Sequence, residues 1–440
     1  MSKIFKTYKG NVVKRVLIIS PFFPPTNTAD MQRIRMSLPY FAEFGWQPEV
    51  VVVDECYSDL TKDELLLESL PGGVKIHKVR ALPKNITSKI GLGSIALRSL
   101  LFYKERVNQL LKAETFDLIY FSTTQFPICI LGPYWKKRFN VPYIIDMQDP
   151  WHTEYYKDKS QNDRPPKYWF SYRLNKYLEP IAMKNVGGLI SVSEHYIIDL
   201  QNRYPRLKTI PAATITFGAF ELDNTIARDN AEKFELLLNP DFKNLVYVGR
   251  GGTDMHKALN VLFAAVKCGQ EKHPDLFKTL KITFIGTSYA PAGQGKPTIL
   301  PLARQFGVED TVIEITDRIS YYHTMFTLQQ ADALFIPGSD SAGYTASKIY
   351  PYLLNNKPLL AIINSKSPAA DVLREYDVKN IYYFDRGVET EQAITSFLIQ
   401  LLRGAMDTPK YNSRAIEKYS ALNMTRKQCQ LFDLVITKNS

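Results

Sequence analysis

Residues 250–257, with the sequence Arg-Gly-Gly-Thr-Asp-Met-His-Lys, place two cations around a glycine-rich turn. They follow an apolar run that predicts a buried strand over 244–249, and a helix is expected to begin near Lys257. Backbone N–H groups at such a helix start point at an anion, and Arg250 and Lys257 would add two positive charges. Fixed donors and cations suit a diphosphate, because they strengthen as charge builds on a leaving oxygen. The alternative is a glycine-rich turn with solvated charges, and the pattern alone does not decide between them.

A second group of chemically active side chains follows the strand expected at 142–146. Asp149 and His152 are candidates for holding or deprotonating a hydroxyl group. Trp151 could stack on the face of a sugar ring, or it could be packed in the core. A lone histidine is also often structural, so the role of His152 stays open at this point.

The loop after the first expected strand contains two prolines, which stiffen it, and a run of polar residues. Pro25, Thr26 and Asn27 stand before a helix expected over 29–44, which Gly45 ends. Polar side chains at a helix start, on a loop held by a rigid sheet, are candidates for binding a ligand.

Two arginines lie on that same expected helix. Arg33 and Arg35 are two residues apart and therefore do not share a face. At least one of them is expected to be solvated. The other, which we take to be Arg33, either reaches an anionic acceptor or is solvated as well.

These residues depend on strands that recur along the whole chain. Unbroken apolar runs, rich in β-branched residues and bounded by turn residues, indicate strands buried on both faces of a parallel sheet. The strands expected in the first half are 14–21, 49–54, 117–122, 142–146 and 188–193. Those expected in the second half are 244–249, 280–286, 312–316, 333–338 and 357–362. Helical patterns lie between them, which predicts an α/β protein with two doubly wound Rossmann-like sheets.

The length of 440 residues predicts two domains, or three small ones, at roughly 150 residues per domain. We expect an N-terminal domain over 1–220, a second domain over 221–412 and a linker near 217–241. A final helix within 413–440 would pack back toward the N-terminal domain. Ligands of open parallel sheets bind beyond the carboxyl ends of the strands, so two such sheets facing each other would place the active site in the cleft between them.

The order of these segments resembles the retaining glycosyltransferases of family 4, which have the GT-B fold. The resemblance covers nearly the whole chain. It is carried by the opening strand and loop from Val16, by Asp146–Trp151, by Val248–Arg250, and by Ser347–Tyr350 ahead of an Asn-Lys-Pro sequence.

The resemblance implies that the second domain binds a nucleotide-sugar donor. Arg250 and Lys257 would hold the diphosphate, and Asp317 and Arg318 would lie near the nucleobase, although a simple loop salt bridge is as good an account of the last two. The other implied donor-binding residues are Gly249, Gly251, Ser341, Gly343, Tyr344, Thr345, Ser347 and Lys348. The N-terminal domain would bind the acceptor through Pro25, Thr26, Asn27, Arg33 and Trp151, with Asp149 and His152 as catalytic candidates.

One departure from the family affects the expected chemistry. Members usually carry two glutamates with seven residues between them in the donor loop, and here those positions are Gly343 and Pro351. Either the enzyme is active with other donor contacts, such as Asp340, or it is a degenerate transferase that binds nucleotide or glycan without reacting. We favour activity because Arg250 is retained together with its lysine partner. An epimerase is a third and weaker alternative.

A further departure concerns the acid/base group. Many members have a histidine after the strand that corresponds to 117–122, and the sequence here has none at that place. In a retaining reaction the leaving phosphate can itself take the acceptor proton. The enzyme then acts mainly by positioning its substrates and stabilising charge.

The composition limits the kinds of molecule that the protein is expected to bind. Hydrophobic residues make up 45% and charged residues 22% of the chain, as in soluble globular proteins. Residues 1–220 hold 30 Lys and Arg against 20 Asp and Glu, whereas 221–440 hold 25 against 24. The basic first half suggests an anionic partner, such as an anionic membrane surface or a phosphorylated acceptor. With the family resemblance, we expect a saccharide or polyprenyl-linked acceptor. General solubility explains the charge equally well, and nucleic acid is not expected because no binding motif accompanies it.

The remaining features point to a cytoplasmic location. The four cysteines, Cys56, Cys129, Cys268 and Cys429, are dispersed, which fits a reducing compartment rather than disulfides or zinc. Neither a secretory signal nor a spanning helix is recognisable, so we expect a cytoplasmic protein, in part peripheral at the inner face of the plasma membrane. No metal site and no cofactor are expected, and cationic side chains would take the electrostatic role of a metal.

Overall fold

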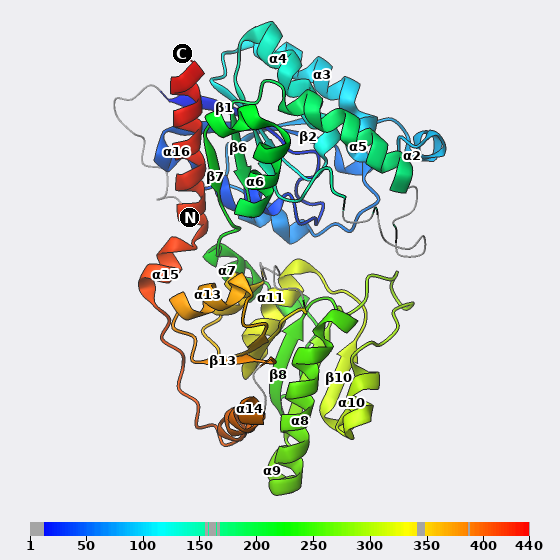
Figure 1. The fold of residues 1–440 in the computed structure, drawn as a ribbon, viewed down its shortest axis with the longest axis vertical. Coiled ribbons are helices and arrows are strands. Elements are labelled where there is room, and N and C mark those ends of the chain that lie inside the picture. The colour runs from blue at the N-terminus through cyan, green and yellow to red at the C-terminus, as the bar shows by residue number, and fades with distance from the viewer. Residues whose placement is uncertain are drawn as a thin grey trace. The chain divides into compact units, whose positions relative to one another are not determined.

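The structure, a computed structural model, describes residues 13–154, 157, 164, 168–340, 348–385 and 388–439 (Figure 1). The chain divides into two compact units. Unit 1 consists of residues 1–218 and 420–440, and unit 2 of residues 219–419. The chain therefore passes between the units twice, and each unit is described separately.

Unit 1 is built on a parallel sheet that has seven strands within the described residues, in the order β3-β2-β1-β4-β5-β6-β7. The strands are β1 (Lys14–Ile19), β2 (Trp46–Val53), β3 (Lys75–Val79), β4 (Leu118–Ser122), β5 (Tyr143–Met147), β6 (Gly188–Ser191) and β7 (Ala212–Thr214). The central strands β4 and β5 are fully buried, and β1 is fully buried from Val16 on, as their apolar runs predict. The order reverses between β1 and β4, and this reversal is where open α/β sheets bind ligands.

Helices cover both faces of this sheet (Figure 1). The helices of unit 1 are α1 (Gln32–Ser37), α2 (Lys84–Thr87), α3 (Ile95–Ala113), α4 (Leu131–Phe139), α5 (Tyr168–Met183), α6 (Glu194–Arg203) and α16 (Ala421–Asn439). The core on one face is formed with α3, α4 and α5. On the other face, the ring of Phe432 from α16 lies 5.3 Å from that of Trp46 and 5.0 Å from that of Tyr120.

Unit 2 repeats the same strand order in a parallel sheet with six strands in the described part of the chain, β10-β9-β8-β11-β12-β13. The strands are β8 (Lys243–Val248), β9 (Leu280–Ile285), β10 (Val312–Ile315), β11 (Ala333–Pro337), β12 (Leu359–Ile363) and β13 (Asn380–Tyr383). Here the order reverses between β8 and β11. The loops after these two strands are therefore the expected ligand site of unit 2.

The helices of unit 2 alternate with its strands. They are α7 (Glu221–Asp229), α8 (His256–Lys272), α9 (Pro274–Phe277), α10 (Leu300–Phe306), α11 (Tyr321–Gln330), α12 (Ile349–Leu353), α13 (Pro368–Glu375), α14 (Val388–Leu402) and α15 (Ser413–Lys418). The prediction of two doubly wound parallel sheets in one α/β chain is thus confirmed.

Two predicted helices are shorter than expected. The helix predicted over 29–44 is two segments, α1 and the 3₁₀ turn Phe41–Phe44, because Pro39 has no N–H with which to continue a helix. Gly45 ends the second segment in the left-handed conformation, with φ of 75°. The final helix predicted within 413–440 is also divided, since α15 belongs to unit 2 and α16 to unit 1.

The close approach of two backbone segments requires glycine at position 218. A Cβ atom there would lie 2.7 Å from the backbone nitrogen of Ala421, closer than packed atoms allow. The segment that leaves unit 1 at Gly218 therefore lies directly against the start of α16. None of the described helices is both long and apolar enough to span a bilayer.

Candidate functional site

The loop after β8 in unit 2 contains the glycine and arginine that the sequence singled out. Gly249 adopts φ of 156° and donates its N–H to Ile285 of β9 at 2.8 Å. A Cβ atom at this position would collide with the Lys348 ammonium. Gly251 similarly donates its N–H to the carbonyl of Thr287 at 2.8 Å. Both N–H groups are used within the fold, so any contact of these two glycines with a donor would not be through their own N–H groups.

Lys348 occupies the space above Gly249. Its Nζ lies 3.4 Å from the hydroxyl oxygen of Tyr247 and 5.1 Å from the centre of the Tyr247 ring. Burial lowers the pKa of Lys348 to about 8, and the nearby charges of Arg250 and Arg318 lower it further in the same direction. Three cations therefore meet at the switch point of unit 2.

Arg250 is held in place by a carboxylate four residues further on. Its guanidinium donates to both oxygens of Asp254, at 2.9 and 2.7 Å. This bond is the main cause of the lowered pKa of Asp254. The Asp254 carbonyl accepts the N–H of Asp340 at 2.8 Å, which ties the loop after β8 to the loop after β11.

Lys257 has a more open environment than Lys348. It lies in the first turn of α8, its side chain is 62% exposed, and its Nζ is 3.6 Å from the Asp340 carboxylate. The sequence paired Arg250 with Lys257 as the diphosphate ligands, and the structure brings Lys348 into the same cluster as a buried third cation.

Asp317 and Arg318 follow β10, as predicted. The Asp317 carboxylate accepts the N–H of Gly293 at 3.0 and 3.1 Å. The Arg318 guanidinium lies 5.4 Å from the centre of the Tyr289 ring, and this ring is 72% exposed. An exposed aromatic ring backed by an arginine could stack on a nucleobase. The sequence reasoning missed Tyr289, for which the available signal was an aromatic residue directly after a buried strand.

Some predicted donor contacts lie outside the described residues. They are Ser341, Gly343, Tyr344, Thr345 and Ser347. The helix that follows them, α12, is anchored to the sheet because the N–H of Val248 donates to the Tyr352 hydroxyl at 2.8 Å. This bond fixes Pro351, one of the two positions where the family has a glutamate, within a helix packed on β8.

The switch point of unit 1 carries a buried carboxylate. Asp30, in the segment after β1, is 3% exposed and accepts hydrogen bonds from the Thr123 hydroxyl at 3.0 Å and the Thr124 N–H at 3.2 Å, both after β4. The pKa of Asp149, after β5, is raised by partial loss of water and then by the charge of Asp30. Asp149 is therefore a candidate base near a second carboxylate. The sequence reasoning missed Asp30, which no periodic pattern distinguishes.

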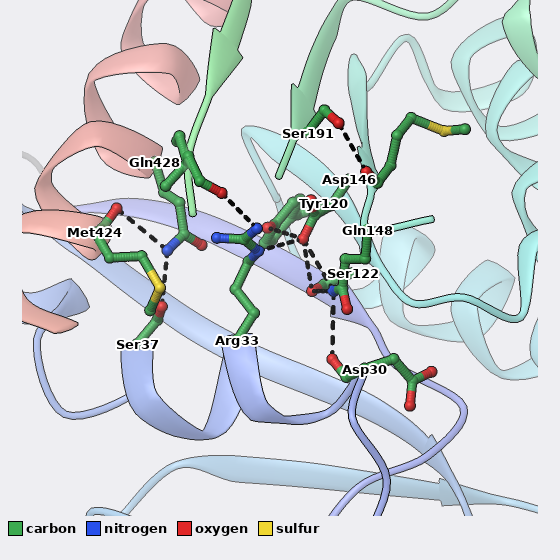
Figure 2. A network of polar contacts seen from close by, with 12 residues as sticks. Asp30, Arg33, Ser37, Tyr120, Ser122, Asp146, Gln148, Ser191, Met424 and Gln428 are labelled. Carbon is green, nitrogen blue, oxygen red and sulfur yellow. Dashed lines mark hydrogen bonds and ion pairs between the residues drawn. The ribbon is translucent and has the colours of Figure 1, made fainter. Parts of the chain in front are cut away.

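Arg33 does not have the role predicted from the sequence. Its side chain is fully buried in an ion pair with Asp146, with 2.5 Å between Nε and Oδ2, and Nη2 donates to the Ile215 carbonyl at 2.7 Å (Figure 2). Asp146 also accepts from Tyr120 at 3.2 Å and from Gln148 at 3.0 Å. A fully enclosed pair has no surface for an acceptor, so Arg33 positions the strands instead.

The expectation that Arg33 or Arg35 is solvated is also wrong. Arg35 is fully buried and donates from Nε to Gln32 at 2.8 Å. On the same helix, Ser37 accepts from Gln428 of α16 at 2.8 Å (Figure 2). The C-terminal helix covers α1 on the side that the sequence pattern left to solvent.

The proline-rich loop is packed rather than open. Thr26 is 2% exposed and forms an isolated bridge with Lys62. The Asn27 N–H donates to Thr61 at 2.9 Å, and the Pro25 carbonyl accepts from Asp63 at 2.8 Å. Of the three predicted acceptor contacts, Asn27 keeps a partly exposed side chain.

Trp151 and His152 are both largely buried, with exposures of 4% and 8%. The Trp151 ring is stacked on Phe126 at 5.4 Å, and its Nε1 donates to Asn175 at 3.1 Å. Burial, followed by the charge of Arg203, lowers the pKa of His152, so the imidazole is neutral near pH 7. Both residues line a cavity, to which we return below. No cluster of three metal-binding side chains occurs among the residues that the structure describes.

Two Rossmann-like parallel sheets in one chain are consistent with the GT-B fold, and the similarity to solved structures supports this fold. The chain resembles HepE from Anabaena, solved in complex with UDP, with a TM-score of 0.54 and 14% identity over 95% of this chain and 99% of that one. It also resembles a UDP-forming α,α-trehalose-phosphate synthase from Burkholderia xenovorans in complex with glucose-6-phosphate, with a TM-score of 0.56 and 11% identity over 95% and 100% of the two chains. At such identities the likeness establishes the fold. No protein-family model and no curated protein matches the sequence.

Proposed function

We propose that this chain is a glycosyltransferase that moves a sugar from a nucleoside diphosphate donor on unit 2 to an acceptor on unit 1. The observation that carries the proposal is the partly buried Lys348 ammonium, which lies above Gly249 and the Tyr247 ring and is affected by the charges of Arg250 and Arg318. Among the described residues, no carboxylate is paired with Lys348. Burying an unpaired ammonium is costly, and a diphosphate would offset that cost by supplying the missing negative charge.

The chemistry expected at this cluster follows from its charge. In the reaction, the bond between the anomeric carbon of the donor sugar and the diphosphate oxygen breaks, and a bond to an acceptor oxygen forms. The negative charge that develops on the leaving diphosphate is stabilised by Arg250 and Lys348, with Lys257 at the rim. The acceptor proton passes either to Asp149 or to the departing diphosphate. The fold of chains solved with UDP supports a uridine nucleotide as the first donor to test.

Finer features of the proposal come from the sequence resemblance to family 4. We propose that the anomeric configuration is retained, that the cationic side chains act without a metal ion or other cofactor, and that the acceptor is a saccharide or polyprenyl-linked sugar in surface polysaccharide assembly. Asp317, Arg318 and Tyr289 would contact the nucleobase. We propose a cytoplasmic location, at the inner face of the plasma membrane, for the transfer from the sugar nucleotide.

A membrane surface is part of the same proposal. Trp169 and Phe170 at the start of α5 are 48% and 46% exposed, and the Arg164 guanidinium lies 5.1 Å from the Trp169 ring. Exposed aromatic rings among basic side chains are typical of contacts with the interface of an anionic bilayer. This arrangement supports a peripheral association through unit 1.

The proposal is tested by nucleotide binding and then by turnover. In titration calorimetry, UDP or GDP should bind and uridine or guanosine should not, because the diphosphate is the group that the cations hold. Incubation with the matching sugar nucleotides and a panel of saccharide and lipid-linked acceptors should release the nucleoside diphosphate. If neither diphosphate binds, the function is wrong. Tight binding without turnover on any acceptor would instead support a degenerate, non-enzymatic transferase.

Gly249→Ala should weaken UDP binding about 10-fold or more while leaving the protein folded. The new methyl group meets the end of the flexible Lys348 side chain, which can move only by leaving the cluster. The positive φ of Gly249 adds a stability loss of about 1 kcal/mol. Gly72→Ala is the control, since nothing lies within 4 Å of its Cβ position. Unchanged UDP affinity in Gly249→Ala, measured by calorimetry, would remove Lys348 from the binding site.

A further inference from the structure

A cavity of about 420 Å³ opens in unit 1 between α5, α6 and the segment after β5. Its volume falls within the range of small-molecule sites, ~300–1,000 Å³. It lies beyond the carboxyl ends of β5 and β6, on the side of the sheet where ligands bind. The lining residues that matter here are Trp151, His152, Glu154, Glu179, Tyr196 and Asp199.

The floor of this cavity is a satisfied ionic network. Glu179 is 1% exposed, is ion-paired with Arg203, and accepts hydrogen bonds from the His152 N–H and the Tyr204 hydroxyl, both at 3.0 Å. Arg203 also donates to the His152 carbonyl at 3.2 Å. Because Arg203 neutralises Glu179 and the network fixes the backbone of His152, the floor is rigid and carries no net charge of its own.

One polar atom in the cavity wall has no hydrogen-bond partner. His152 is buried, with 8% of its surface exposed, yet its Nε2 makes no hydrogen bond within the described part of the chain. The carboxylate of Glu154 is 3.8 Å away, beyond hydrogen-bond distance. An imidazole nitrogen can donate or accept one bond according to its tautomer, and leaving it unsatisfied costs about 1–3 kcal/mol. A ligand hydroxyl could satisfy it in either tautomer.

The rim adds carboxylates and an aromatic side chain. Glu154 and Asp199 are each 50% exposed, and Asp199 lies 3.4 Å from His195, its neighbour one turn earlier on α6. Tyr196 comes from the same helix, and the largely buried Trp151 also lines the wall. Carboxylates accept bonds from hydroxyl groups and repel phosphates, while aromatic rings pack against the apolar face of a sugar.

We propose that this cavity binds an uncharged sugar unit of the acceptor. The inference rests on the proposed transferase activity and adds where the acceptor sugar binds and that this sugar is uncharged. A neutral floor, a neutral imidazole with an unused nitrogen, rim carboxylates and aromatic walls match a polyhydroxylated ring better than an anion or a lipid chain. The polyprenyl or other carrier, where one is present, would lie outside the cavity.

The position of the cavity relates it to the carboxylates at the unit 1 switch point. Pro150, the residue after Asp149, lines the cavity. Burial and then the charge of Asp149 raise the pKa of Tyr196 in the cavity wall. The cavity therefore adjoins the candidate base. A sugar held beside His152 could present a hydroxyl group to Asp149.

The experiment uses the full chain and a panel of methyl glycosides of glucose, galactose, mannose and N-acetylglucosamine at millimolar concentration, with and without UDP. Saturation-transfer NMR should detect at least one neutral glycoside. Tyr196→Phe and Asp199→Asn should each weaken it about 10-fold, the effect of losing one or two hydrogen bonds. Asn202→Ala, on α6 but outside the cavity lining, is the matched control and should change nothing. UDP affinity should be the same in all of these variants.

The outcomes separate this inference from the proposed function. If UDP binds and no glycoside does, the sugar subsite is wrong and the donor site stands. Binding of glucose 6-phosphate without binding of neutral glycosides would make the cavity an anion site and overturn the inference. Glycoside binding that survives both substitutions would place the sugar elsewhere. Loss of UDP binding in the wild-type chain would instead refute the transferase assignment.

Discussion

Replacing Lys348 with methionine should lower the affinity for UDP by about 10- to 100-fold and at the same time stabilise unit 2. The loss of affinity follows from removing a cation that bonds to a phosphate, an interaction worth about 1.5–3 kcal/mol. The gain in stability follows because burial and two neighbouring cations oppose the charge of Lys348 in the free protein. Methionine retains the apolar length of the side chain without that charge.

The direction of the stability change in Lys348→Met follows from how the stability of the wild type depends on pH. The pKa of Lys348 is 10.5 in its ordinary state and about 8 in the folded chain. Between these values the unfolded state binds more protons, so the stability of the wild type rises with pH across this interval. The Lys348→Met variant should therefore be more stable by ~1–3 kcal/mol at pH 7, from about 1.4 kcal/mol per unit of pKa less screening. This advantage should shrink from pH 8 toward 10.5.

The pH dependence of binding has the opposite direction. Wild-type affinity for UDP should fall as the pH rises above about 8, because free Lys348 loses its proton there and the diphosphate requires it charged. In Lys348→Met this fall should be absent. Calorimetric titrations between pH 7 and 9.5 test the point. A parallel decline in both proteins would show that another group is responsible.

Unit 2 can be followed separately from unit 1 in these measurements. All four tryptophans, Trp46, Trp135, Trp151 and Trp169, belong to unit 1. Tryptophan fluorescence therefore marks the unfolding of unit 1, and a calorimetric transition without a fluorescence change belongs to unit 2. Lys136→Met is the matched control, since burial lowers the pKa of Lys136 as well but the residue is in α4 of unit 1. It should leave UDP affinity and the unit 2 transition unchanged.

The central strands of both sheets could be predicted from sequence because burial on two faces demands unbroken apolar runs. The strands that the sequence analysis missed are β3, β7 and β13, which lie at sheet edges. Edge strands have one neighbour and are partly solvated. In β3 only the last residue, Val79, is buried, and β7 has three residues, none of them buried. Such strands form because a neighbouring strand offers hydrogen bonds, which local sequence does not record.

The candidate site was likewise predicted only in part from the sequence. The strand-end rule led to the loops at Gly249 and Asp149, since their position follows from the strand order. The pairing of side chains did not follow, because it depends on segments that are distant in sequence. Lys348 meets Gly249 only through the neighbouring strands β8 and β11, and Asp30 meets Thr123 only through β1 and β4. A single amino-acid sequence carries no signal for such contacts.

For Arg33, the contacts with distant segments reversed the prediction made from sequence. Substitution of Arg33 also has the largest expected effect on stability. Arg33→Met should lower the free energy of unfolding of unit 1 by about 3–5 kcal/mol, because it leaves the Asp146 carboxylate buried without its cation. Urea unfolding followed by tryptophan fluorescence measures it. Asp146→Leu should cost a similar amount, since it leaves the guanidinium enclosed between Ile215 and the ring of Phe217, 4.9 Å away.

The double variant Arg33→Met with Asp146→Leu distinguishes a buried pair from a simple packing requirement. If each single substitution destabilises unit 1 because it leaves one buried charge without its partner, the two apolar side chains together should recover most of the lost stability. Tyr120 and Gln148 would then lose one acceptor, which limits the recovery to within about 1–2 kcal/mol of the wild type. Additive losses in the double variant would contradict this account. UDP binding on unit 2 should be unchanged throughout, because both residues belong to unit 1.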